Sequence, residues 1–156
     1  MNNYFIILAS GQSKRFNSHK PKQFIKYKNK ALFEHSIDKA ILSKLFKKII
    51  LVTNDKKQIK KKYPNIVSVI SGGKERSDSS LIALRYIKKF KPGNVLIHDA
   101  ARPNFSIKLL KRLISSLKDS GASIPVIDSK DSIKYKVSNQ LFNLKRENSY
   151  LTQTPQ

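Results

Sequence analysis

The chain has 156 residues, of which 39% are hydrophobic, and its 32 basic and 10 acidic residues give a formal net charge of +22. This length suits one domain with a substantial core, and the absence of cysteine excludes a disulfide framework and thiol catalysis. The three histidines, His19, His35 and His98, lack the spacing of a zinc site, and the apolar run at residues 4–9 is too short to cross a membrane, so we expect a cytoplasmic protein.

Short apolar runs alternate along the chain with segments of helical periodicity. Five runs predict strands, at residues 4–9, 48–53, 66–70, 94–98 and 122–127. Four other segments predict helices, at residues 32–45, 56–63, 79–90 and 107–120. In the third helix, Leu81, Leu84 and Ile87 fall on one face. This order predicts an α/β domain with a mostly parallel sheet, helices on both of its faces, and the strand-to-helix loops gathered along one edge.

The loop after the first strand combines small residues with cations. Ala9, Ser10 and Gly11 leave backbone N–H groups accessible to phosphate, and Arg15 and Lys22 can converge on a polyphosphate from two sides. The loop has neither the Gly-Lys-Ser/Thr of a P-loop nor the three glycines of a dinucleotide fingerprint. In so basic a chain an ordinary surface loop explains this pattern about equally well, so the other loops must decide between the two interpretations.

Two further polar loops are expected at the same edge of the sheet. The segment from Gly72 to Ser79 follows the third strand and begins a helix, where Asp78 or Ser79 can act as the cap. Its small residues and exposed N–H groups also suit a base and a ribose.

The sequence His-Asp-Ala-Ala-Arg-Pro at residues 98–103 follows the fourth strand, at the end of the sheet where open α/β proteins bind ligands. Asp99 can hold a hydroxyl or a metal ion, and Arg102 can grip an anion with two parallel hydrogen bonds. The simpler alternative is an ordinary loop in which Asp99 pairs with Arg102.

Residues 128–147 are predicted to form a hairpin that projects from the sheet. Apolar residues at 133, 135 and 137 alternate with polar ones, and Asn139-Gln140 is a candidate turn. Hairpins with half-exposed apolar residues are marginal alone, so we expect this β-arm to pack against another subunit.

Taken in order, these motifs resemble the 2-C-methyl-D-erythritol 4-phosphate cytidylyltransferases of the non-mevalonate isoprenoid pathway. The resemblance implies a nucleotide-diphospho-sugar transferase (Rossmann-like) fold, a homodimer that exchanges β-arms, and CTP, methylerythritol phosphate and Mg²⁺ as ligands. The motifs that carry it are Ala9-Ser10-Gly11 with Arg15, Pro21-Lys22-Gln23, Gly72-Gly73-x-Glu75-Arg76-x-Asp78-Ser79, residues 98–103, Asp128-Ser129, Arg146 and Thr154-Pro155-Gln156.

The resemblance also assigns roles to individual residues. Arg15 and Lys22 would be catalytic, stabilising the charge on the transferring phosphoryl group. Mg²⁺ would be held mainly by the CTP phosphates, with Asp99 as a possible protein ligand. The residues implied to bind the nucleotide are Ala9, Ser10, Gly11, Gly73, Ser79, Asp99 and Ala100. Those implied to bind methylerythritol phosphate are Arg102 and, from the partner's arm, Ser129 and Arg146.

The sequence departs from the family pattern in two ways. Gln12-Ser13 stands where a second glycine is usual, and Ser10, Lys74 and Ser129 replace a usual Ala, acidic residue and Thr. The family also continues well past Thr154-Pro155-Gln156. We therefore interpret residues 1–156 as a single nucleotidyltransferase domain that is incomplete at its C-terminus, and expect the chain alone to be poorly active.

Two other functions are compatible with parts of the sequence. A cytidylyltransferase acting on a pentitol phosphate, such as ribitol 5-phosphate, shares much of the same loop set. The net charge of +22 raises the second alternative, a basic nucleic-acid-binding protein. The lysines are spread along the whole chain, however, without an aromatic stacking pattern, zinc finger or helix-turn-helix. We therefore expect no specific nucleic-acid partner.

Overall fold

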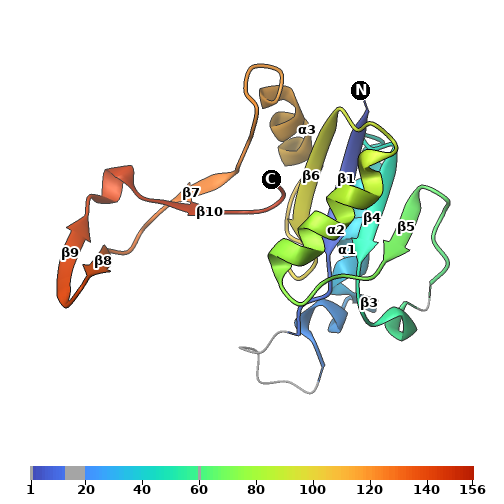
Figure 1. Cartoon of the computed structure of the whole chain (residues 1–156), viewed down its shortest axis with the longest axis horizontal. Coiled ribbons are helices and arrows are strands. Elements are labelled where there is room, and N and C mark those ends of the chain that lie inside the picture. Colours follow the sequence, from blue (N-terminus) through green and yellow to red (C-terminus); the bar gives the residue numbers. More distant parts are fainter. Residues whose placement is uncertain (1, 13–19, 60) are drawn as a thin grey trace.

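The computed structural model describes residues 2–12, 20–59 and 61–156 (Figure 1). Four parallel strands pair in the order β5–β4–β1–β6. Their bounds lie within one residue of those predicted: β1 (Asn3–Leu8), β4 (Lys48–Val52), β5 (Val67–Ile70) and β6 (Asn94–Asp99). Leu8 lies opposite both Val52 and Asp99, so three neighbouring strands end level at one edge of the sheet.

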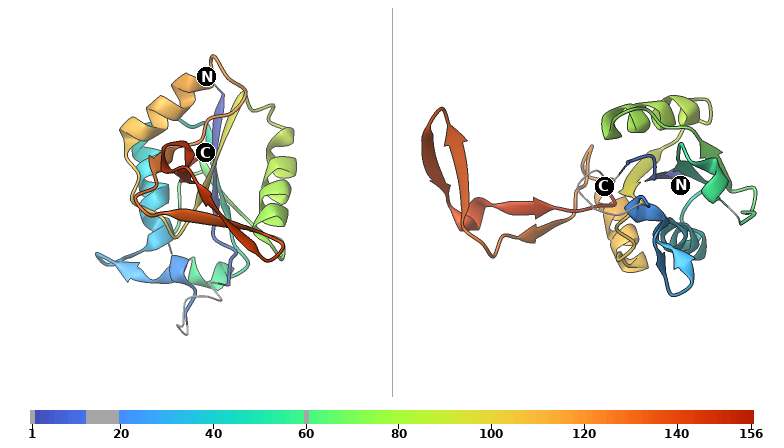
Figure 2. Two further views of the ribbon diagram at one scale, coloured as in Figure 1. Left: turned by 90° about the vertical axis from the view of Figure 1, so that its left-hand side faces the viewer. Right: turned by 90° about the horizontal axis from the view of Figure 1, so that it is seen from below.

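Helices cover both faces of this sheet. They are α1 (Leu32–Ser43), α2 (Arg76–Lys88) and α3 (Ile107–Ser116). Because successive strand residues point in opposite directions, Phe5 and Ile7 pack against α1 and α3, while Tyr4 and Ile6 pack on the side of α2. Figure 2 shows α2 on one side of the sheet and α1 and α3 on the other, which confirms the predicted layers. Burying one such large apolar side chain contributes roughly 1.5–3 kcal/mol.

The helix ends differ from the prediction. Helix α2 begins three residues early, at Arg76, because the Asp78 carboxylate accepts a hydrogen bond from the N–H of Glu75 (3.1 Å) and caps the first turn. Helix α1 ends at Ser43 and α3 at Ser116, two and four residues before the predicted ends. Across the described part of the chain, no helix combines the length and the apolar character that crossing a membrane requires.

The packed face of α2 is also rotated from the apolar face of the sequence pattern. Ile87 is buried, but Leu81 and Leu84 are 47% and 38% exposed. The other buried residues of the helix are Ala83 and Ser79, one and two turns before Ile87 respectively. Their small side chains let α2 lie close to the sheet, and this displaces the two leucines toward solvent.

Two predicted elements are wrong. Of the helix expected at 56–63, the described residues contain only the 3₁₀ turn η2 (Lys56–Gln58). Like charges four positions apart, such as Lys57 and Lys61, oppose a helix here, and Pro64 disfavours helical backbone at the residue before it. The strand expected at 122–127 is replaced by the shorter β7 (Val126–Asp128), which leaves the main sheet and pairs with β10 (Tyr150–Thr152).

The predicted β-arm is confirmed. Strands β7 and β10 form its stem, and β8 (Ile133–Val137) and β9 (Gln140–Leu144) form its tip, joined to β10 through the 3₁₀ turn η3 (Arg146–Asn148). The turn between β8 and β9 lies at 138–139, one residue before the predicted position. The arm extends away from the sheet and its helices (Figures 1 and 2).

A small element connects the first loop to α1. It consists of the 3₁₀ turn η1 (Lys22–Phe24) and a two-stranded ribbon, β2 (Lys26–Tyr27) and β3 (Lys30–Ala31). The turn of this ribbon places Lys28 and Asn29 at φ values of 48° and 62°. Positive φ at both central residues is typical of the tight turns that join antiparallel strands.

Candidate functional site

Three strand-to-helix loops meet at the carboxyl edge of the sheet, as the topology predicts. They follow β1, β5 and β6 and line one cavity of about 310 Å³. The predicted nucleotide residues among its lining are Ser10, Gly11, Asp99 and Ala100. Lys74, Glu75 and Arg76 complete the side formed by the loop after β5.

Ser79 is buried and joins two of these loops by hydrogen bonds. Its hydroxyl lies 2.7 Å from that of Ser10 and accepts a hydrogen bond from the N–H of Gly73 at 3.1 Å. Gly73 is required by the close approach of α2, since a Cβ at this position would lie 2.3 Å from the Cβ of Asp78. The predicted residues Ser10, Gly73 and Ser79 are therefore brought together.

Gln23, which belongs to the motif Pro21-Lys22-Gln23 but was not predicted as a site residue, holds the first loop. Its Nε2 donates to the carbonyl oxygens of Ala9 (2.8 Å) and Gly11 (2.7 Å). Lys22 precedes it at the start of η1, so this predicted catalytic cation is attached to the same loop. Arg15, the other predicted catalytic residue, lies outside the described residues.

Asp99 lies between two arginines. Arg76 Nε donates to its Oδ1 at 3.0 Å, and Arg102 Nε lies 3.7 Å from its Oδ2. The pair that the simpler alternative predicted is thus present, and Arg76, which was not predicted as a site residue, joins it. All three side chains are partly exposed, and ion pairs of this kind contribute about 0–1 kcal/mol to stability. A bound anion can therefore replace Asp99 as the partner of either arginine at a small cost in free energy.

The described residues contain no cluster of three or more His, Asp or Glu side chains that could hold a metal ion. The carboxylates that line the cavity are Glu75 and Asp99. One carboxylate together with substrate phosphates is a common mode of Mg²⁺ binding, because this ion retains several of its waters.

The loop after β6 is fixed by two basic side chains behind it. Lys39 of α1 donates from Nζ to the carbonyl oxygens of Pro103 (2.7 Å) and Phe105 (2.8 Å), and partial burial lowers its pKa. His98 is fully buried between the rings of Phe5 and Phe105. Burial lowers the pKa of His98 to about 4, so the imidazole is neutral at pH 7.

Ser129 and Arg146 lie together in the β-arm, where its stem meets its tip. The N–H of Ser129 donates to the carbonyl oxygen of Ser149 (3.3 Å). The N–H of Ser149 in turn donates to the carbonyl oxygen of Arg146 (3.1 Å). Because the arm extends away from the sheet, a single chain does not bring these two predicted residues to Arg102 (Figure 1).

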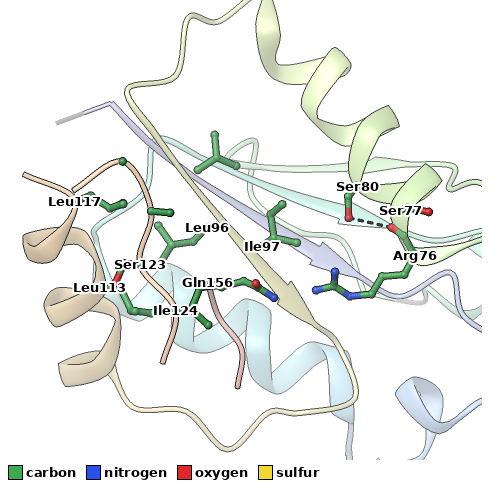
Figure 3. Close-up of a pocket in the computed structure, with 13 residues that line it drawn as sticks. Arg76, Ser77, Ser80, Leu96, Ile97, Leu113, Leu117, Ser123, Ile124 and Gln156 are labelled. Carbon is green, nitrogen blue, oxygen red and sulfur yellow. Dashed lines mark hydrogen bonds between the residues drawn. The ribbon is translucent and has the colours of Figure 1, made fainter. Parts of the chain in front are cut away.

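A second cavity of about 420 Å³ runs along the outer edge of β6 (Figure 3). Its lining is mainly apolar, with Leu96, Leu113 and Ile124 among its residues, and none of the predicted site residues belongs to it. Arg76 extends along this edge toward Gln156, so its side chain borders both cavities.

The chain is similar to known proteins over nearly its whole length. The family model of 2-C-methyl-D-erythritol 4-phosphate cytidylyltransferase (IspD) matches residues 4–156. The bifunctional enzyme IspD/IspF of Pelagibacter ubique is 53% identical over 100% of this chain and 43% of its own length. The 2-C-methyl-D-erythritol 4-phosphate cytidylyltransferase of Thermotoga neapolitana is 30% identical, over 99% of this chain and 71% of its own.

Solved structures show the same fold. The bifunctional IspDF of Campylobacter jejuni has a TM-score of 0.83 at 30% identity and covers 99% of this chain, which spans 40% of that protein. The IspD of Francisella tularensis has a TM-score of 0.81 at 31% identity, over 99% of this chain and 71% of its own. The chain thus spans less than half the length of these bifunctional relatives, and the expected Rossmann-like nucleotidyltransferase fold is confirmed. The chain belongs to the 2-C-methyl-D-erythritol 4-phosphate cytidylyltransferase family.

Proposed function

We propose that the chain transfers the cytidylyl group of CTP to 2-C-methyl-D-erythritol 4-phosphate and releases pyrophosphate. The observation that carries the proposal is the meeting of three loops around one cavity, which Ser10 and Asp99 line, with hydrogen bonds that join Ser10 and Gly73 through Ser79. Relatives that match nearly the whole chain are named for this activity.

The nucleotide occupies the cavity between the loops that follow β1, β5 and β6. Small residues there leave room for a base and a ribose, and Asp99 is placed to accept hydrogen bonds from hydroxyl groups. The residues assigned to this half are Ala9, Ser10, Gly11, Gly73, Ser79, Asp99 and Ala100.

The reaction needs charge stabilisation more than proton transfer. An oxygen of the acceptor's phosphate, already an anion, forms a bond to the α-phosphorus of CTP, while the bond from that phosphorus to the α–β bridging oxygen breaks and pyrophosphate leaves. No general base is required. The barrier arises from repulsion between anions and from charge that grows on the transferring group, and the cations Arg15 and Lys22 are assigned to offset both.

Mg²⁺ is assigned to the triphosphate, with Asp99, which lines the cavity, as a possible protein ligand. When bound, it neutralises part of the phosphate charge. Asp99 would then exchange one of its arginine contacts for the ion, which the partial exposure of these side chains permits.

The acceptor half of the site is assigned to Arg102 and to Ser129 and Arg146 from the arm of a second copy. An extended arm with apolar side chains in solvent supports this homodimer. The arm carries nine of the fifteen large hydrophobic residues that are exposed in the described part of the chain: Val126, Ile127, Tyr135, Val137, Leu141, Phe142, Leu144, Tyr150 and Leu151. The cytoplasmic location expected from the sequence belongs to the same proposal.

The test is pyrophosphate release by the purified chain with CTP, Mg²⁺ and either methylerythritol phosphate or ribitol 5-phosphate, together with calorimetry of CTP binding. We expect low but measurable turnover with methylerythritol phosphate, its loss with a chelator, and preferential binding of CTP over ATP. Turnover with ribitol 5-phosphate alone would support the pentitol alternative. A steep salt-dependent affinity for nucleic acid, with neither CTP binding nor turnover, would contradict the proposal.

A further inference from the structure

The buried His98 has no part in the proposed reaction, yet its ring makes two specific polar contacts. Nε2 lies 3.2 Å from the hydroxyl of Ser36 on α1, and Nδ1 lies 3.1 Å from the hydroxyl of Thr154. A hydroxyl group both donates and accepts, so a neutral imidazole is satisfied at both nitrogens. The ring therefore bridges α1, β6 and the segment that follows β10.

That segment, residues 153–156, is the root of the β-arm, where the arm returns to the sheet. Gln156 exchanges two backbone hydrogen bonds with Ile97 of β6, at 2.6 and 3.0 Å. The N–H of Gln153 donates to the carbonyl oxygen of Pro125 (2.8 Å), which connects the root to the outgoing strand of the arm. The arm is thus attached to the sheet along the outer edge of β6.

The root also contacts the candidate site, at the backbone N–H of Asp99 and at the side chain of Arg102, which is assigned to the acceptor half. The Thr154 hydroxyl accepts a hydrogen bond from the N–H of Asp99 (3.4 Å), and Gln153 Oε1 accepts one from Arg102 Nη1 (3.5 Å). One hydroxyl therefore lies between the buried imidazole of His98 and the backbone of Asp99.

We propose that His98 is a positioning residue that, through Thr154, fixes the root of the β-arm against Asp99 and Arg102 and so shapes the acceptor half of the site. A ring needed only for packing could be apolar, because Phe5 and Phe105 supply its surroundings. An apolar ring here, however, leaves the hydroxyls of Ser36 and Thr154 without this partner. The kinetic part of the inference rests on the proposed function, while its structural part does not.

Two variants separate the hydrogen bonds from the packing. His98→Phe retains an aromatic ring between Phe5 and Phe105 and removes both polar contacts, while Thr154→Val removes only the hydroxyl. Thr154→Ser retains the hydroxyl and should restore the wild-type behaviour. Thr152→Val, at an exposed position of β10, is the matched control for losing a threonine hydroxyl.

The first readout is amide hydrogen exchange without any ligand. We expect the N–H groups of Ile97, Asp99 and Gln156 to exchange at least about fivefold faster in Thr154→Val and in His98→Phe, as the loss of one hydrogen bond implies. Thr154→Ser and Thr152→Val should match the wild type. Unchanged exchange in Thr154→Val would overturn the proposal even if His98→Phe did not fold.

The second readout is kinetic. In Thr154→Val the KM for methylerythritol phosphate should rise at least about fivefold while the Kd for CTP changes less than about twofold. If the KM for methylerythritol phosphate and the Kd for CTP rose equally, the network would support the whole fold and not the acceptor half in particular. That result would also overturn the proposal. If the wild-type chain shows no turnover, the proposed function fails, and the exchange rates still decide whether His98 positions the root.

Discussion

The hydroxyl oxygens of Ser10 and Ser79 lie 2.7 Å apart although 69 positions separate the two residues in the sequence. Ser79 is fully buried, and its oxygen also accepts the N–H of Gly73. One hydroxyl thus connects the loop after β1, the loop after β5 and the first turn of α2. These hydrogen bonds hold the three segments together beside the proposed nucleotide cavity, which lowers the cost of ordering these loops around CTP.

Replacing Ser79 should weaken both the fold and nucleotide binding. Ser79→Ala removes the shared hydroxyl and leaves the Gly73 N–H without its partner, so we expect the free energy of unfolding to fall by about 1–2 kcal/mol and the Kd for CTP to rise about fivefold or more. Urea unfolding and calorimetry measure the two effects. Ser77→Ala, at an exposed position of the same helix turn, should change neither. A normal CTP affinity in Ser79→Ala would remove this residue from the nucleotide site.

The layers of the fold could be predicted because β1 and β4 are short, continuous apolar runs, which is typical of strands that are buried on both faces. Phe5 and Ile7 face one helix layer and Tyr4 and Ile6 the other, as any strand covered on both sides requires. The packed face of α2 could not be predicted in the same way. There a small residue, Ala83, decided which side approaches the sheet, and the more hydrophobic Leu81 was left exposed.

In the candidate site, too, some contacts could be predicted from the sequence and others could not. Asp99 and Arg102 adjoin a recognisable strand end, so their proximity follows from local sequence. The contact of Arg76 with Asp99 spans 23 positions, and it depends on how the loop after β5 meets the loop after β6. The sequence feature that could have pointed to Arg76 is the rarity of arginine in a lysine-rich chain, since the planar guanidinium suits carboxylate and phosphate partners.

Lys22 is expected to act mainly in the transition state. In Lys22→Ala, and equally in Arg15→Ala, kcat should fall about a hundredfold while the KM for CTP changes little, because both cations are assigned to charge that grows during transfer. One such contact contributes on the order of 3 kcal/mol. Steady-state pyrophosphate release measures this, with Lys26→Ala on the exposed strand β2 as the control. Near-normal kcat in both variants would exclude this loop from catalysis.

Arg102→Lys should separate the two halves of the site. Lysine retains the charge but not the planar fork that can bind a phosphate with two parallel hydrogen bonds, so we expect weaker binding of methylerythritol phosphate and nearly unchanged binding of CTP. Calorimetry with each ligand separately decides this. Arg112→Lys, on the exposed face of α3, is the matched control. Equal damage to both affinities would place Arg102 in the nucleotide half.

The stability of the chain should depend on pH through His98. Burial lowers the pKa of its imidazole to about 4, a shift that the neighbouring Asp99 carboxylate only partly opposes. In the unfolded chain the ordinary histidine value of about 6.5 applies, so as the pH falls the unfolded state takes up the proton first. The contribution of a neutral His98 is therefore fully present above about pH 6.5 and declines progressively toward pH 4. The separation between the two pKa values corresponds to about 3 kcal/mol.

Urea unfolding of the wild type and of His98→Gln, which cannot titrate at this position, isolates this contribution from that of the carboxylates. We expect the wild type to lose more stability than the variant between about pH 7 and pH 4.5. Parallel curves would show that the imidazole is already accessible to protons in the folded chain.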